Sequence, residues 1–248
     1  MQKREFLKSA LGGAILASGI TAIHAEEAKP AAAPATPAAP TLPPAPDPSI
    51  NFENQNYFAD ILQKYRHDKK VGEVMLVRYL GGSNAHIEFY KKTVNDAWEL
   101  RFETDGYVGK NGIDKTKEGD AKTPTGDFGI LNAFGILPNP GTKLHYTAVT
   151  PTTFACDEEG PYYNTIIDAK KVGHACKGEE MYEVSPQYNY GIETDFNRER
   201  VYPKGSAIFL HVKGVKPYTG GCVAIDQEHM KTVLKLAGPG MRIVVHAN

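Results

Sequence analysis

Cys222 and His211 are the two residues of this chain whose types and spacing predict covalent chemistry. An apolar segment ends at His211, and Cys222 follows eleven positions later, directly after Thr-Gly-Gly. A cysteine acts as a nucleophile when a base takes its proton and backbone N–H groups stabilise the oxyanion that forms. His211 can supply the base, and Gly220 and Gly221 have no side chains to block the approach of a ligand to the backbone. The pattern therefore predicts a cysteine nucleophile.

The cysteine count bears on whether that thiol is free. The chain has 3 cysteines, and in an oxidising compartment an odd number leaves one unpaired. Cys156 and Cys176 lie twenty residues apart in a polar, loop-like stretch, so we expect them to form a disulfide, which at this loop length stabilises by about 3 kcal/mol. Two alternatives stay open: Cys222 pairs with one of them and is inert, or His145, Cys156, His174 and Cys176 bind zinc, although no C-x-x-C pair is present.

The first 25 residues have the pattern of an export signal. Three basic residues precede an apolar run from Ala10 to Ile23, and Ala25 ends a typical cleavage sequence. The run falls short of the roughly 20 residues that a membrane-spanning helix requires. We therefore expect residues 1–25 to be a cleaved signal peptide, the mature protein to be exported to the periplasm or cell envelope, and no stable membrane span to remain after cleavage. A Lys-Arg pair also resembles a twin-arginine signal, which leaves the export route open.

Residues 26–50 are predicted to be a Pro/Ala-rich linker, because they hold eight of the 17 prolines and cannot form a core. Beyond them we expect an N-terminal helix in residues 51–72 and one catalytic domain in residues 73–248. The net charge of the chain is -1 and its charged residues are dispersed, so nothing indicates a nucleic-acid partner. No feature of the sequence fixes the oligomeric state.

Short segments rich in β-branched and aromatic residues predict a mainly β domain with few helices. Such a pattern favours a β-sandwich or a partly open barrel. The segment from residue 155 to 189 is long and irregular, which is typical of a lid or an insertion. We expect strands at residues 74–80, 86–90, 98–102, 128–131, 144–149, 190–196, 207–211 and 241–245, and helices at residues 57–65 and 227–237.

Three segments together resemble the YkuD-type L,D-transpeptidase catalytic domain. Thr219-Gly-Gly-Cys222 after His211 matches the family's Ser/Thr-x-Gly-Cys signature. Residues 118–128 resemble its Glu-Gly-Asp and Thr-Pro turn with the strand that follows, and residues 205–211 resemble the strand that delivers the histidine. They occur in the family's order and span most of residues 73–247.

The resemblance implies a fold, a substrate and a reaction. The expected fold is mainly β, a sandwich or partly open barrel of the L,D-transpeptidase type with peripheral helices, and no metal or organic cofactor is needed. The expected substrate is the stem peptide of peptidoglycan. Cys222 would attack the carbonyl at the L-centre of the third stem residue, D-alanine would leave, and a thioester would remain. An amine from a neighbouring stem would then form a 3-3 crosslink, whereas water would release a tripeptide.

The resemblance also implies roles for the residues around Cys222. His211 would act as general base and then general acid, with its other ring nitrogen held by a backbone carbonyl of Val212 or Thr219. The N–H groups of Gly221 and Cys222 would form the oxyanion hole, with Gly220 leaving the approach open. Thr219 would orient the turn.

The sequence departs from the family pattern at two positions. Ala224 stands two places after the cysteine, where many members have Arg or Asn, and Gly220 stands where a histidine is common. Substrate-binding residues are therefore left unknown. Lys117, Glu118 and Asp120 either touch substrate or form a solvated loop, and the solvated loop is the favoured interpretation.

Three functions are compatible with these residues. The leading hypothesis is an L,D-transpeptidase that forms 3-3 crosslinks. The first alternative is an L,D-carboxypeptidase that trims tetrapeptide stems to tripeptides and so affects cell shape. The second is a catalytically silent wall-binding module.

Overall fold

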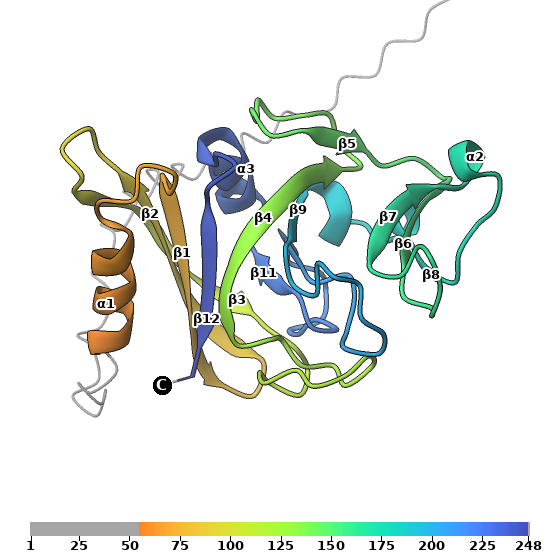
Figure 1. The fold of residues 1–248 in the computed structure, drawn as a ribbon, viewed down its shortest axis with the longest axis horizontal. Helices are drawn as coiled ribbons and strands as arrows, with labels where there is room; N and C mark the ends of the chain where they lie inside the picture. Colours follow the sequence, from red (N-terminus) through yellow and green to blue (C-terminus); the bar gives the residue numbers. More distant parts are fainter. Residues whose placement is uncertain (1–54, 248) are drawn as a thin grey trace, which may run out of the picture. The chain divides into compact units, whose positions relative to one another are not determined.

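The computed structural model describes residues 55–247, so the expectations for the signal peptide, the linker and residues 51–54 lie outside the described part. Most of the domain is one nine-stranded mixed sheet (Figure 1). Its strands are β1 (Glu73–Gly81), β2 (Asn84–Lys92), β3 (Trp98–Tyr107), β4 (Gly126–Gly135), β5 (Tyr146–Ala148), β9 (Gly191–Thr194), β10 (Phe209–Val212), β11 (Val223–Ile225) and β12 (Arg242–His246).

The sheet closes on itself as a barrel. Its strand order is β12-β1-β2-β3-β11-β10-β9-β4-β5, and an additional pairing joins β12 to β4. The ring is weakest between β3 and β11, where a single residue pair, Tyr107 with Ala224, connects the strands. The mainly β prediction is confirmed, and of the two expected architectures the chain adopts the barrel.

Strand β1 shows why this sequence forms a closed sheet with a helix outside it. Its residues 74–77 are all buried, because successive side chains of a strand face opposite sides and both sides are covered here. Met75 and Val77 face the barrel interior. Val74 and Leu76 pack against the N-terminal helix α1 (Gln55–Tyr65), which runs alongside β1 in Figure 1.

Helix α3 (Gln227–Leu236) covers one end of the barrel core. Its buried residues Met230, Val233 and Leu234 belong to the same cluster as the strand interior. This apolar stripe has the i, i+3, i+4 spacing of an amphipathic helix. The helix ends just before Ala237 and Gly238, close to the predicted end.

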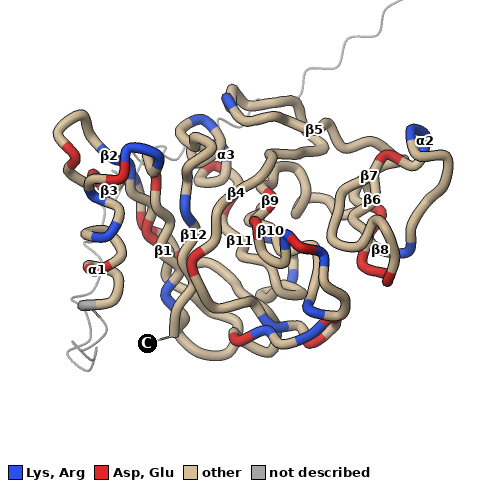
Figure 2. Tube along the Cα trace, in the orientation of Figure 1, with Lys and Arg blue, Asp and Glu red and all other residues tan. Residues whose placement is uncertain are grey.

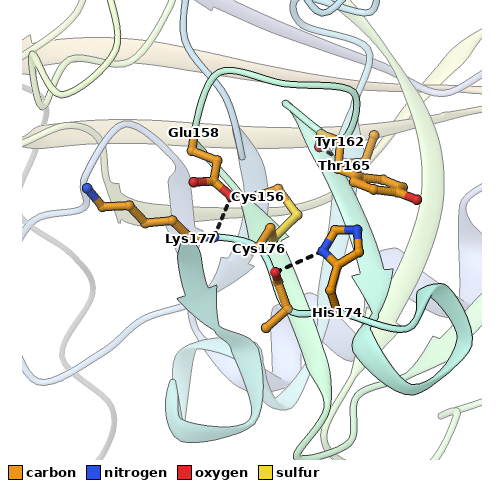
Figure 3. Close-up of a disulfide and its surroundings, with 8 residues drawn as sticks. Cys156, Glu158, Tyr162, Thr165, His174, Cys176 and Lys177 are labelled. Carbon is orange, nitrogen blue, oxygen red and sulfur yellow. Dashed lines mark hydrogen bonds between the residues drawn. A yellow bond between two sulfur atoms is a disulfide. The ribbon is translucent and has the colours of Figure 1, made fainter.

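The segment predicted to be irregular contains a second, three-stranded sheet, so that part of the expectation is wrong. Strands β6 (Thr153–Cys156), β7 (Thr165–Asp168) and β8 (Gly178–Glu180) pair in the order β7-β6-β8, with the short helix α2 (Ala169–Val172) between β7 and β8. Three- and four-residue strands are too short to show a periodic pattern. A disulfide joins Cys156 to Cys176, whose Cα atoms are 5.7 Å apart (Figure 3).

Acidic and basic residues are interspersed along the described part of the chain, as Figure 2 shows. None of the helices within residues 55–247 is both long and apolar enough to span a membrane.

Candidate active site

Two neighbouring parallel strands bring Cys222 and His211 to the same face of the sheet. In the register of β10 and β11, Leu210 pairs with Val223 and His211 with Ala224. Leu210 and Val223 face the barrel core, so the alternation of the pleat turns His211 and Cys222 to the opposite face. Cys222 immediately precedes β11 and lies across from Phe209, whose N–H donates to its Sγ at 3.3 Å.

The Cys222 thiol is free and buried. Its residue is 7% exposed, and the S–H group donates to the carbonyl oxygen of Ala207 at 3.2 Å. Burial, and to a lesser extent the negative charge of Glu179, raise the pKa of Cys222 to about 12 against the opposing effects of the Phe209 N–H and of Lys115. The resting cysteine is therefore a neutral thiol.

His211 is held in one tautomer. Its Nδ1 lies 2.7 Å from the carbonyl oxygen of Val212, and since a carbonyl can only accept, Nδ1 carries the proton and Nε2 is the basic nitrogen. Burial lowers the pKa of His211 to about 4, although the bond to Val212 favours the charged form. At neutral pH the imidazole is uncharged and can accept a proton. Of the two backbone carbonyls expected to hold this nitrogen, Val212 or Thr219, it is that of Val212 that does so.

Two threonines fix the backbone of Cys222. Thr219 Oγ1 donates to the Cys222 carbonyl oxygen at 2.7 Å, and Thr123 Oγ1, which is fully buried, donates to the same oxygen at 3.2 Å. The Thr123 hydroxyl also accepts from Gly109 N–H at 2.8 Å. The Thr-Pro segment and the Thr-Gly-Gly-Cys turn, which are almost a hundred residues apart, therefore meet at this carbonyl.

The two glycines before Cys222 have different roles. Gly221 adopts a φ of +149°, and a Cβ there would lie 2.8 Å from the carbonyl oxygen of Lys122, whereas a Cβ on Gly220 would meet nothing within 4 Å. The Gly221 N–H donates to Thr219 Oγ1 at 3.1 Å. The Gly221 N–H therefore already has an acceptor. Its role in the oxyanion hole stays a prediction, which requires the bond to Thr219 to be shared or broken.

Cys222 and His211 line one cavity of about 310 Å³. One side of it belongs to the small sheet and the segment after it, through Ala155, Asp157, Glu179 and Tyr188. The Tyr188 ring stands edge-on to His211 with 5.6 Å between ring centroids. The segment from 155 to 189 therefore forms a wall beside the thiol, in line with its expected place as a lid or insertion.

A larger cavity of about 850 Å³ adjoins the first. The two share Ala155, Ala207 and Ile208 as lining residues. The larger cavity lies beneath β6 and β7, over β4, β9 and β10, and its charged lining residues are Asp168, Lys171, Glu193, Arg198 and Arg200.

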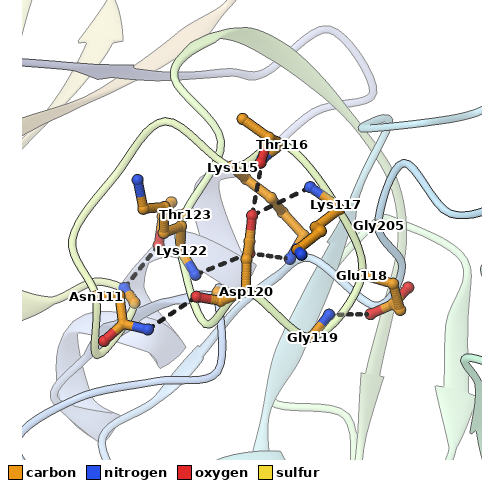
Figure 4. A network of polar contacts seen from close by, with 12 residues as sticks. Asn111, Lys115, Thr116, Lys117, Glu118, Gly119, Asp120, Lys122, Thr123 and Gly205 are labelled. Carbon is orange, nitrogen blue, oxygen red and sulfur yellow. Dashed lines mark hydrogen bonds and ion pairs between the residues drawn. The ribbon is translucent and has the colours of Figure 1, made fainter.

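The turn that contains Lys117, Glu118 and Asp120 is not a simple solvated loop. Asp120 is 9% exposed and pairs with Lys115 at 2.8 Å, and it accepts from the N–H groups of Thr116, Lys117 and Lys122 (Figure 4). Burial alone would raise the pKa of Asp120, but these contacts hold it well below its usual range.

Glu118 is likewise tied into the fold, because Tyr163 Oη and Ser206 Oγ both donate to it at 2.7 Å. Of the three residues, only Lys117 has the exposed position of a solvated loop. The solvated-loop interpretation is wrong for Glu118 and Asp120.

Lys115 was missed in the sequence. Its side chain is 2% exposed and lines the cavity that holds Cys222. Within the run Lys-Thr-Lys-Glu-Gly-Asp, no sequence signal distinguishes the buried lysine from exposed Lys117.

The disulfide decides between the alternatives for the other cysteines. Cys156 and Cys176 are bonded to each other, and Cys222 is the free cysteine, as the odd count predicts. Both sulfur atoms are thereby used, so the zinc alternative is wrong. Within residues 55–247, no cluster of three or more His, Cys, Asp or Glu side chains has the arrangement of a metal site.

A free thiol beside a neutral imidazole, in a barrel with this turn, fits the resemblance seen in the sequence. The model of the YkuD family, the L,D-transpeptidase catalytic domain, matches residues 88–245. The chain belongs to this family. As a member of the YkuD family it carries the domain of enzymes that act on cell-wall peptidoglycan.

Solved structures similar to this YkuD-family chain share little sequence with it. The helical cell shape determining protein Pgp2 from Campylobacter jejuni is 13% identical, with 76% of this chain and 55% of that chain covered and a TM-score of 0.39. The Ldtfm–avibactam carbamoyl enzyme is 16% identical, with 73% of this chain and 50% of that chain covered and a TM-score of 0.37. The chain spans about half the length of these proteins. No curated protein sequence matches it.

Proposed function

We propose that this protein is a peptidoglycan L,D-transpeptidase that acts through a thioester on Cys222 and forms 3-3 crosslinks between stem peptides. The observation that carries the proposal is the pair of Cys222 and His211, on one face of adjacent strands and in one cavity. Membership in the YkuD family supports the substrate class.

The geometry supports a sequence of steps in which every proton has a carrier. The Cys222 thiol leaves its bond to Ala207 and gives its proton to His211 Nε2 as the sulfur attacks the carbonyl carbon at the L-centre of the third stem residue. Because the pKa values place the proton on sulfur at rest, transfer accompanies attack and does not precede it. The imidazolium then protonates the amine of D-alanine as the C–N bond breaks, and the thioester remains.

The second half of the reaction repeats these roles. Neutral His211 takes a proton from the attacking amine of a second stem, the C–S bond breaks, and the proton returns to the sulfur. The N–H groups of Gly221 and Cys222 stabilise both oxyanions, once Gly221 N–H is released from Thr219.

The larger cavity favours crosslinking over hydrolysis. Trimming a stem to a tripeptide requires space for one peptide and water, whereas crosslinking requires space for two peptides at the thioester. The cavity of about 850 Å³, which shares Ala155, Ala207 and Ile208 with the cavity of Cys222, offers room for the second. L,D-carboxypeptidation is the alternative that uses the same thioester.

The deciding experiment incubates the purified protein with disaccharide tetrapeptide and weighs the products by mass spectrometry, with Cys222→Ala as the blank. Crosslinked dimer that lacks one D-alanine supports the proposal. Tripeptide without dimer supports the carboxypeptidase, and intact substrate supports the silent wall-binding module.

We further propose that residues 1–25 direct export and that the protein works in the periplasm or cell envelope. In this proposal residues 26–50 are a tether or spacer for the catalytic domain. The disulfide between Cys156 and Cys176 supports an oxidising compartment. Mass spectrometry of the protein isolated from an envelope fraction tests cleavage after Ala25.

A further inference from the structure

Lys115 is a buried lysine in the cavity of the candidate nucleophile. Its side chain is 2% exposed, and its Nζ lies 2.8 Å from Asp120 Oδ1. Among the described residues, the ammonium group donates only to this carboxylate, although a lysine carries three N–H donors. Removing a charged pair from water costs several kcal/mol per ion, so stability alone is weak reason to bury one.

Gly205 makes room for this lysine, and Gly221 lies next to its ammonium group. A Cβ on Gly205 would collide with Lys115 Cε, and a Cβ on Gly221 would lie 3.7 Å from Lys115 Nζ. Gly221 is the residue directly before Cys222, so the ammonium group lies beside the peptide that carries the nucleophile.

The Asp120 carboxylate is arranged to hold the lysine without cancelling its charge at the thiol. Besides Lys115 it accepts from three backbone N–H groups (Figure 4), which spread its negative charge over the turn. Lys115 lines the Cys222 cavity, whereas Asp120 does not.

The rest of the cavity opposes a negative charge on sulfur. Apart from Lys115, the titratable and charged side chains that line it are Glu118, Asp157, Glu179, Tyr188, His211, Lys216, Tyr107 and Tyr218. The three carboxylates repel a thiolate, buried His211 is neutral at rest, and Lys216 is exposed to solvent. Lys115 is the buried cation of the cavity, and its field lowers the pKa of the Cys222 thiol.

We propose that the Lys115 ammonium group, held by Asp120 in the space left by Gly205, stabilises the negative charge that develops on Cys222 when His211 removes its proton. Lys115 acts through its position beside Cys222 and forms no bond to the substrate; the thiol proton goes to His211 Nε2. The inference deepens the proposed function by adding a charge-stabilising residue that acts through Cys222.

The test measures the rate of alkylation of Cys222 by iodoacetamide as a function of pH, which needs no peptidoglycan. Compared with the wild-type protein, Lys115→Met is expected to react about tenfold more slowly at pH 7, with its alkylation profile displaced upward by about one pH unit. Lys117→Met is the matched control, because it removes the same charge from the same turn at an exposed position and should leave the profile unchanged. Lys115→Arg should restore most of the wild-type rate.

Loss of the fold is separated from loss of the charge. Lys115→Met leaves Asp120 buried without a counter-ion, so a second variant, Lys115→Met with Asp120→Asn, removes both charges and is expected to fold. Circular dichroism verifies the fold of each variant. An alkylation profile of either folded variant that overlays the wild-type profile overturns the inference, as does an equal displacement in Lys117→Met.

The same variants separate this inference from the proposed function. If wild-type protein forms no crosslinks and no tripeptide but Lys115→Met still displaces the alkylation profile, the charge-stabilising role stands and the proposed reaction fails. If wild-type protein crosslinks stems and the alkylation profile of Lys115→Met equals that of wild type, the proposed reaction stands and the charge-stabilising role of Lys115 fails.

Discussion

Replacing Thr123 by valine tests whether the Thr-Pro segment positions the nucleophile. Valine keeps the shape of the side chain and removes the hydroxyl that accepts from Gly109 N–H and donates to the Cys222 carbonyl. That carbonyl keeps its bond to Thr219, but the buried Gly109 N–H is left without its acceptor. An unsatisfied buried donor costs about 1–3 kcal/mol, so we expect the free energy of unfolding to fall by about 2 kcal/mol. For a domain of this size that lowers Tm by about 4–8 °C.

The assay is urea unfolding followed by circular dichroism, paired with the rate of Cys222 alkylation. The alkylation rate is expected to change as well, because the backbone of Cys222 loses one of its two fixed points. Thr125→Val is the matched control: Thr125 lies two residues later and its hydroxyl donates to the exposed Asp114, so its loss should cost less than about 0.5 kcal/mol. If the two variants are equally stable, the argument that Thr123 joins the motif to the nucleophile is refuted.

Three further predictions rest on the turn, the histidine and the disulfide. Gly221→Ala should lower the free energy of unfolding by about 2 kcal/mol or more, because its φ is positive and a backbone carbonyl oxygen lies 2.8 Å from the new Cβ. Gly220→Ala is the control: with open space around the new Cβ, it should change the free energy of urea unfolding by under about 0.5 kcal/mol. Burial lowers the pKa of His211 from 6.5 to about 4, so the unfolded state binds the proton first as the pH falls. The free energy of unfolding that depends on neutral His211, up to about 3 kcal/mol, is therefore fully present above pH 6.5 and lost by about pH 4. A His211→Gln variant with the same dependence of urea unfolding on pH as wild type would contradict this. Removing the disulfide with Cys156→Ala and Cys176→Ala should lower the stability of the small sheet by about 3 kcal/mol, seen as faster hydrogen exchange of β6 and β8 amides; unchanged exchange would show that the strands hold without it.

Long elements with a clear period were predictable from the sequence. The strands at residues 74–80 and 86–90 and the helix at 227–237 correspond to β1, β2 and α3 within a few residues at each end. Each has enough alternating or helical positions for a pattern to emerge. By contrast, β6, β7, β8 and β11 have three or four residues, which is too few for either pattern to appear.

Cysteine and histidine were the parts of the candidate site that the sequence could indicate, because their side chains have few roles in common other than catalysis and metal binding. Cys222 and His211 could be selected because a glycine-flanked cysteine and a histidine at a strand end have few other combined uses. The closeness of Thr123 to Cys222 could not be, because it is a long-range contact with no local signal. Lys115 illustrates the same limit, since its burial depends on the space that Gly205 leaves, and Gly205 is far from it in sequence.

Strand β1 extends the barrel upstream of the residues that the family model matches. The family match starts at residue 88, inside β2, yet β1 lies between β12 and β2 and pairs with both. A chain cut at the start of the match would leave β12 without its parallel partner and open the barrel core along one side. For expression, truncation or fusion, the N-terminal boundary therefore belongs before β1, and before α1 as well, because the outer face of β1 is apolar and α1 covers it.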